Sequence, residues 1–252
     1  MTRRILVAAI CAAGLLSAQE KTELTLDQIL QKHYAAMGGA DAMKALKTIV
    51  GSGKAQMMGG QLEMTISMKL KRPNMMRQDM AFQGRSLVQA YDGTTAWMIN
   101  PFTGGADAQK MGDVEAEQVA DSADLDGPLV DYKAKGHTVE LLGKEDIEGS
   151  PTYKVKVTRK NGRTETFWLD ASTFLPIKSV AKVSQMGQDM EVETYPGNYK
   201  KVGGVMMPFT LEQKTGGKAF LSLTIEKFEP NVPVDDADFK MPAPKPAEEK
   251  KN

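Results

Sequence analysis

Hydrophobic positions follow two periods along the chain, and the change comes near residue 48. Before it, they recur at i, i+3, i+4, i+7 and i+11, the spacing of one face of an α-helix over 25–37. Thr25 and Gln28 have the spacing of a capping box, and Gly38-Gly39 favours the end of this helix. A second, short helix is predicted over 40–46. The predicted buried stripe of the first helix is Leu26, Ile29, Leu30, His33 and Met37.

From residue 48 onward the hydrophobic period is two, which is typical of β-strands with one buried face. Residues 63–70 alternate without error, and residues 153–158 do the same. The first of these segments places four apolar side chains on one face: Met64, Ile66, Met68 and Leu70. The strongest hairpin signal is Asn161-Gly162, which lies between two alternating runs. Strands are predicted over 47–57, 61–71, 74–82, 85–91, 94–100, 138–144, 152–159, 163–170, 175–183, 189–196 and 206–228, the last containing two strands.

So long a series of strands must curl or fold over, because a flat sheet would leave one face wet and its edges exposed. The N-terminal helices supply apolar faces that suit the concave side. The predicted fold class is therefore mainly β (α+β): a strongly curved antiparallel sheet wrapped around one or two N-terminal helices. Residues 112–126 interrupt the strand pattern, are acidic, and favour a helix or an ordered loop.

The N-terminus has the three regions of a secretory signal peptide. Arg3 and Arg4 precede an apolar run over 5–16, and small residues follow at Ser17 and Ala18. The run has about 12 residues, fewer than the ~20 needed to cross a bilayer. A membrane anchor or a buried helix is the alternative interpretation, and cleavage after residue 18 or 19 stays open.

The predicted organisation is a signal peptide over 1–19, a single domain over 20–241 and a disordered tail over 242–252. The tail is rich in Pro, Ala, Lys and Glu, a composition that cannot bury a core. The only cysteine, Cys11, falls in the signal peptide, so the exported chain would have no disulfide and no thiolate. The expected location is the periplasm.

Charge and motifs argue against nucleic-acid binding, metal binding and catalysis. The 32 basic and 32 acidic residues give no net charge, whereas a nucleic-acid binder shows a basic surplus. Of the two histidines, His33 is predicted to be a core or boundary residue and His137 a surface residue. The chain shows no metal-ligand spacing, nucleophile elbow or phosphate loop. The acidic cluster Asp121, Asp124 and Asp126 lacks calcium-loop spacing and is interpreted as a solvated face. The prediction is a protein that is not an enzyme and has no cofactor.

With catalytic and metal-binding motifs absent, apolar side chains are the remaining candidates for a binding site. The 17 methionines lie mostly on strand-like segments, and methionine adapts to varied apolar shapes. Two interpretations stay open, since methionine serves equally as core filler or as the lining of a cavity. A half-closed curved sheet with such a lining suits acyl chains. The predicted lining residues are Leu30, Met64, Ile66, Met68, Leu70, Trp97 and Ile99.

Four segments resemble bacterial exported proteins of the outer-membrane lipoprotein-sorting group (LolA/LolB-like). They are KRPNMMR (71–77), FQGRSLVQAYDGTTAWMINPFTG (82–104), DGPLVDYKAKGHTVELLGKEDIEGS (126–150) and ETYPGNYKKVGGVMMP (193–208). The resemblance implies an unclosed β-barrel with helices across its opening, a cavity for acyl chains, no cofactor and no catalysis. Recurring turn features of this group match Arg72, Arg77, Asp92 and Gly93. The acidic segment 113–126 and the long second half depart from the classical carrier.

The predicted function is therefore a periplasmic carrier or chaperone that holds acyl chains in a hydrophobic cavity, with helix 25–37 as a lid, for lipoprotein sorting or lipid transport. Its expected partners are lipid acyl chains or an acylated lipoprotein, and a membrane-bound donor or acceptor protein. If Trp97 lines the cavity, Trp97→Ala should weaken lipid binding more than it lowers stability. The alternative is a periplasmic sensor or assembly module that binds a protein partner on the same scaffold, and a closed interior would favour it.

Overall fold

The structure is a computed structural model that describes residues 23–103, 105–185 and 188–243. The predicted signal peptide, and the predicted tail from residue 244 onward, lie outside the described residues. No helix in the described part of the chain is long and apolar enough to span a membrane.

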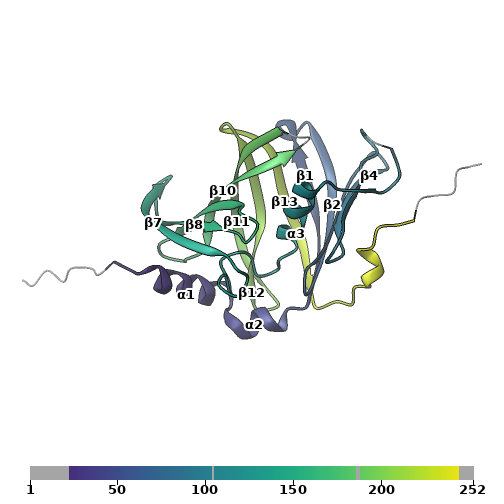
Figure 1. Cartoon of the computed structure of the whole chain (residues 1–252). Helices are drawn as coiled ribbons and strands as arrows, with labels where there is room; N and C mark the ends of the chain where they lie inside the picture. The colour runs from purple at the N-terminus through teal and green to yellow at the C-terminus, as the bar shows by residue number, and fades with distance from the viewer. Residues whose placement is uncertain (1–22, 104, 186–187, 244–252) are drawn as a thin grey trace, which may run out of the picture.

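The described residues form three α-helices, two short 3-10 helices and thirteen β-strands (Figure 1). The helices are α1 (Leu26–Met37), α2 (Gly39–Ala45), α3 (Asp113–Ser122), η1 (Met58–Gly60) and η2 (Asp236–Asp238). The strands are β1 (Thr48–Met57), β2 (Leu62–Lys71), β3 (Met75–Phe82), β4 (Arg85–Tyr91), β5 (Ala96–Ile99), β6 (Gln109–Lys110), β7 (Thr138–Ile147), β8 (Ser150–Thr158), β9 (Thr164–Asp170), β10 (Pro176–Gln185), β11 (Gln188–Val202), β12 (Val205–Thr215) and β13 (Lys218–Pro230).

One antiparallel sheet contains all of these strands, in the order β6-β5-β4-β3-β2-β1-β13-β12-β11-β10-β9-β8-β7. Two meanders, β1–β6 and β7–β13, are joined because β1 pairs with β13. The described sheet therefore ends at β6 on one side and β7 on the other, and the barrel is unclosed (Figure 1). This confirms the predicted fold class, a mainly β chain with a strongly curved antiparallel sheet.

Small residues on the inner side of β1 allow the sheet to curve. A Cβ atom on Gly51 would lie 2.8 Å from the Cγ of Met68 and 2.9 Å from the ring of Phe228. These large side chains close over the bare backbone from the two neighbouring strands, so the sheet can wrap at this point. The register of β1 with β2 is continuous, whereas a bulge opposite Ser52 and Gly53 shifts the register of β13, so that both Phe228 and Ile225 face the concave side.

Helices α1 and α2 lie on the lower end of the sheet in Figure 1. Helix α1 has the predicted capping box, in which Gln28 N–H donates to Thr25 Oγ1 and Thr25 N–H to Gln28 Oε1. The helix ends at Gly38, whose φ of 125° favours glycine. A Cβ atom there would lie 2.4 Å from the carbonyl oxygen of Gly204, so only glycine lets the helix pair approach the β11–β12 turn.

The sequence predicted the strand set, with small shifts of several strand ends and two larger differences. The short strand β6 was not predicted, and β11 continues to Val202 instead of ending near residue 196. Pro196 and Gly197 do not end the strand, because they pair with Leu211 and Thr210 of β12. The turn comes at Gly203-Gly204, where both φ angles are positive. Helix α3 confirms the helical option for residues 112–126.

Candidate functional site

The concave face of the sheet holds five of the seven predicted lining residues. Met64, Ile66, Met68 and Leu70 of β2 share this face, since Ile66 pairs with Gly53 on one side and Met80 on the other. Leu30 reaches the same side of the sheet from α1 and packs with side chains of β8 and β9. The four β2 residues share one face as the periodicity predicts, while Leu30 packs in a separate cluster; that these five residues contact an acyl chain stays a prediction.

The helices cover one end of this face, which we call the covered end. There α2 and its flanking residues pack with the start of β1 and with β12 and β13. Helix α1 packs on β8 and β9. The side chains at this end are fully buried, among them Leu46, Ile49, Val155, Leu169 and Ile225. No space for a ligand is needed to explain the covered end, because it is a packed core.

Farther from α1 and α2, apolar side chains on the same concave face are only half-buried. Met57 pairs with Leu62 and with Leu221, and Val183 pairs with Met190, so the register continues the concave face into this region. We call this region the open end; it lies toward the upper part of the sheet in Figure 1. Its half-buried members are Met57, Leu62, Phe82, Leu87, Val183, Met190, Leu211 and Leu221.

The sequence prediction did not include these open-end residues as lining residues. Each of them follows the alternation of its strand, so the signal was present in the pattern. What the pattern lacks is the cross-strand register, which decides which of the two parities faces inward.

The prediction that Trp97 and Ile99 line the cavity is corrected by the structure. Trp97 pairs with Ala90, which pairs with Arg77, so all three lie on the convex, outer face. Its indole is 1% exposed, and its Nε1–H donates to the carbonyl oxygen of Phe239 over 2.7 Å. The C-terminal segment 231–239 covers the convex face of the sheet at this point. Trp97 is therefore buried between the sheet and this segment.

His33 is buried, as predicted, where α1 packs against the turn that precedes β10. Its Nδ1 lies 2.8 Å from the carbonyl oxygen of Phe174. Burial lowers the pKa of His33, and the hydrogen bond to Phe174 partly opposes the effect. A backbone carbonyl is its partner rather than an acid, so the arrangement is that of a helix-docking residue.

Comparisons with known proteins test the architecture. No family model matches the chain. The curated proteins give no match either. Among solved structures, a LolA superfamily protein from Nitrosomonas europaea is similar over 86% of this chain and 98% of its own, with a TM-score of 0.57 and 15% identity. The chain has the LolA fold.

Two further structures agree. A DUF1329 family protein from Desulfovibrio piger matches with a TM-score of 0.58 and 12% identity, covering 85% of this chain and 96% of that one. A candidate outer membrane lipoprotein-sorting protein domain from Vibrio parahaemolyticus matches with a TM-score of 0.57 and 12% identity, covering 84% and 94%. At these identities the likeness establishes the LolA fold, and the site must be argued from this chain's own residues.

In this version of the LolA fold, helix α3 crosses the concave side. It contacts β3, β4 and β5 on one wing and β10 on the other (Figure 1). Its Val119, with Ala123 just beyond its end, packs with Met76, Ala96 and Met111. The acidic segment 112–126, which interrupts the strand pattern, therefore contributes Val119 and Ala123 to the interior.

The interpretation of Asp121, Asp124 and Asp126 as a solvated acidic face is wrong. Asp121 pairs with Arg163 at 2.7 Å, and Asp124 pairs with Lys135 at 2.6 Å. Asp126 accepts from Arg72 Nη1 over 2.7 Å. Each carboxylate has a cation from another part of the chain, so the acidic segment is tied down at three points.

The turn residues of the family resemblance have structural contacts. Arg72 donates to the carbonyl oxygens of Leu46 and Met43, each over 2.8 Å, and so joins the β2–β3 turn to α2. Asp92 accepts from the backbone N–H groups of Thr94 and Thr95, while Gly93 has a φ of 97°.

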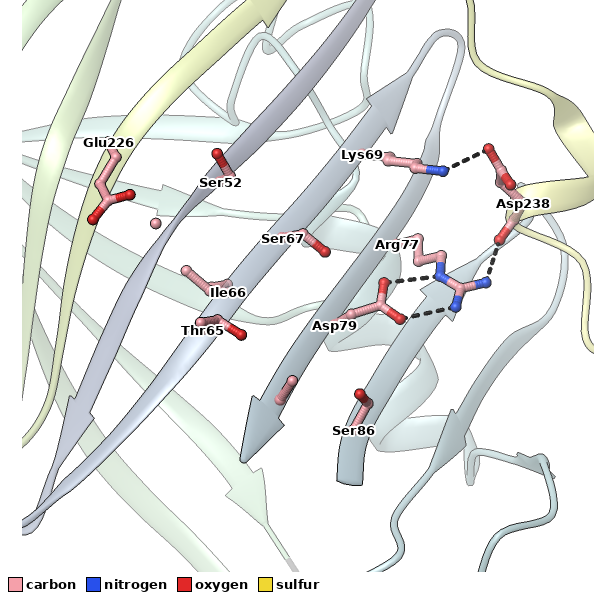
Figure 2. Close-up of a pocket in the computed structure, with 12 residues that line it drawn as sticks. Ser52, Thr65, Ile66, Ser67, Lys69, Arg77, Asp79, Ser86, Glu226 and Asp238 are labelled. Carbon is pink, nitrogen blue, oxygen red and sulfur yellow. Dashed lines mark hydrogen bonds and ion pairs between the residues drawn. The ribbon is translucent and has the colours of Figure 1, made fainter. Parts of the chain in front are cut away.

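Arg77 belongs to a polar hollow on the outer face, shown in Figure 2. The hollow has a volume of about 640 Å³, and the hydroxyl groups of Ser52, Thr65 and Ser67 contribute to its lining. Arg77 donates to both carboxylate oxygens of Asp79 (2.9 and 2.8 Å) and to the carbonyl oxygen of Asp238. Lys69 pairs with Asp238 at 2.8 Å. Its polar lining makes this hollow unsuited to an acyl chain.

A half-buried ion pair lies on the concave side near the end of α3. Arg159 Nη2 is 3.0 Å from Glu165 Oε2, and Arg159 Nε is 3.4 Å from Asp121 Oδ2. Burial raises the pKa of Glu165, while Arg159 lowers it. The described residues contain no group of three or more His, Cys, Asp or Glu side chains placed to hold a metal ion.

Proposed function

We propose that this protein is an exported, non-catalytic carrier that holds the acyl chains of a lipid or lipoprotein against the open end of its concave face. The observation that carries the proposal is the contrast on that face. Apolar side chains are packed at the covered end, whereas apolar side chains on the same face of neighbouring strands stay half-buried at the open end. Contiguous apolar surface that a chain leaves uncovered is characteristic of a binding site.

The energetics support acyl chains as the ligand. Burial of apolar surface contributes roughly 25 cal/mol per Å², so a hydrocarbon chain laid along several strands can bind without any charged contact. Met57 and Met190 at this end supply flexible, polarizable side chains that adapt to different chains. The similar structures include a candidate lipoprotein-sorting domain, which supports the lipoprotein version of the proposal.

The alternative, a module that binds a protein partner, was expected to have a closed interior. The interior is packed at the covered end and beneath α3, whereas apolar side chains of the open end stay half-buried, which favours the carrier. Catalysis by His33 would need an acid beside it and a pocket open to it. Instead, the imidazole of His33 lies against the backbone carbonyl of Phe174, and His33 does not line the polar hollow at Arg77.

Native mass spectrometry of the protein purified from a bacterial periplasm tests the carrier. The expected spectrum shows one or more co-purified lipids in near-stoichiometric amount. Leu221→Gln, on the concave face of β13, should lose them, since it places an amide among apolar side chains. Thr224→Gln, on the outer face of the same strand, should keep them.

A folded protein that stays free of lipid even after lipid is added would contradict the carrier. Equal loss of lipid in Leu221→Gln and Thr224→Gln would remove the open end from the binding site. Circular dichroism of both variants establishes that they are folded.

A further inference from the structure

A second cavity lies at the end of α3, where the β8–β9 turn meets the segment that leads into β7. It has a volume of about 390 Å³, within the range of small-ligand sites. Five of its six lining residues have side chains with nitrogen donors: Lys135, His137, Arg159, Lys160 and Asn161. The sixth is Asp121. A lining of this kind suggests a polar ligand of one charge sign.

The free groups of this cavity are hydrogen-bond donors. His137 Nδ1 accepts from the backbone N–H of Lys160 over 3.1 Å, which leaves its Nε2–H as a donor. Burial and the neighbouring Arg159 and Lys135 lower the pKa of His137, which favours the neutral ring. Asn161 Oδ1 accepts from the backbone N–H of Arg163 over 3.1 Å, which leaves the amide NH₂ as a donor.

Lys160 adds a full positive charge. Its stem packs against Gly136, with the Cδ atom 3.5 Å from where a Cβ atom on that glycine would lie. Among the described residues its ammonium group has no ion-pair partner. The one carboxylate in the lining, Asp121, already receives Arg159 and Arg163. The cavity therefore offers several hydrogen-bond donors, while its one carboxylate is already paired. Such a lining is complementary to an anion.

The position of the cavity connects this anion site to the apolar face. Val157 and Glu165 pair across β8 and β9, and Glu165 pairs with Ala181 of β10. Val183, a member of the open end, is the next residue on the concave face of that strand. A ligand whose anionic group sits in the cavity would reach the concave face by passing Arg159 and Glu165.

We infer that this cavity binds the phosphate group of an anionic phospholipid whose acyl chains lie on the open end. The inference rests on the proposed function, and it narrows the cargo from lipids in general to lipids whose phosphate headgroup carries a net negative charge. A phosphate monoester such as phosphatidate has three non-bridging oxygens that can accept from Lys160, His137 and Asn161, and its negative charge is opposite in sign to that of Lys160. Inorganic phosphate shares this chemistry, so the experiment must separate the two sources.

Isothermal titration calorimetry of the purified protein with three probes makes the separation. The probes are dihexanoyl phosphatidate, zwitterionic dihexanoyl phosphatidylcholine and inorganic phosphate, with both lipids kept monomeric. Phosphatidate should bind about tenfold more tightly than phosphatidylcholine, and phosphate alone should bind more weakly than phosphatidate. Lys160→Gln should reduce the phosphatidate affinity about fivefold and leave phosphatidylcholine binding unchanged. Lys156→Gln, on the outer face of β8, is the matched control and should change neither.

Equal affinities for the two lipids, with no effect of Lys160→Gln, would overturn the headgroup site and leave the carrier intact. Inorganic phosphate binding as tightly as phosphatidate, and weakened by Lys160→Gln, would overturn the lipid source and assign the cavity to a free anion. Binding of neither lipid would overturn the carrier itself.

Discussion

The covered end and the open end of the concave face are built from the same types of apolar residue but differ in burial. At the covered end, α1 and α2 bury leucine, isoleucine and valine side chains completely. At the open end, leucine, methionine and phenylalanine side chains of neighbouring strands remain half-buried. Apolar character alone therefore does not identify a binding surface in this fold. The placement of the helices decides whether an apolar side chain stabilises the fold or is left for a ligand.

The largest expected effect separates the two ends directly. Leu169 is fully buried in β9 beneath α1, so Leu169→Ala should lower the free energy of unfolding by about 2–5 kcal/mol. Leu62, at the open end, should cost less than about 1 kcal/mol when changed to Ala, because water already reaches its side chain. Urea unfolding followed by circular dichroism measures both. Equal losses would show that the open end is as well packed as the covered end.

Trp97 tests whether the convex face is a second core. Trp97→Phe keeps an aromatic ring but removes the Nε1–H donor to Phe239, leaving a buried carbonyl oxygen unpaired. The expected loss is about 1–3 kcal/mol of unfolding free energy. Lipid binding should not change, the reverse of the expectation drawn from the sequence. A variant with normal stability and weakened lipid binding would restore Trp97 to the binding site.

Asp126 tests how firmly the acidic segment is tied to the covered end. Asp126→Asn removes the charge that pairs with Arg72, which keeps its bonds to Leu46 and Met43. Because the pair is partly open to water, the expected cost is about 1–2 kcal/mol. Hydrogen exchange should quicken in the segment after α3. Unchanged exchange there would mean that Asp121 and Asp124 hold the segment without it.

His33 gives the smallest expected effect, a pH dependence of the docking of α1. Burial lowers the pKa of His33 from its ordinary value of 6.5, so the unfolded chain binds more protons just below that pH. Stability from His33 is therefore present above pH 6.5 and decreases as the pH falls. The slope is at most about 1.4 kcal/mol per pH unit.

His33→Asn is the variant that isolates this term, since its side-chain amide can still donate to Phe174 without titrating. Thermal unfolding between pH 7.5 and 5.5 should show a shallower pH dependence than in the unchanged protein. His137→Asn, at a half-buried position, is the control with the smaller expected change. Identical slopes in His33→Asn and the unchanged protein would contradict the assignment.

Much of the architecture was predictable because it depends on local patterns. The capping box at Thr25, the alternation over 63–70 and the Gly38-Gly39 stop are all encoded within a few residues. The errors have a different origin. The alternation around Trp97 correctly separates it from Met98, but it carries no information on which of the two faces inward. The acidic cluster was misjudged because its cations, Arg72, Lys135 and Arg163, come from separate parts of the chain.

The sequence by itself determined the helices, nearly all of the strands and the curved antiparallel sheet, since each depends on periodicity and on turn residues. Only the tertiary structure decided the assignment of faces, because side-chain direction depends on register and on what covers each side. The segment 231–239 buries the convex face at Trp97, and α1 and α2 bury one end of the concave face. The open end is the apolar surface that these long-range contacts leave uncovered.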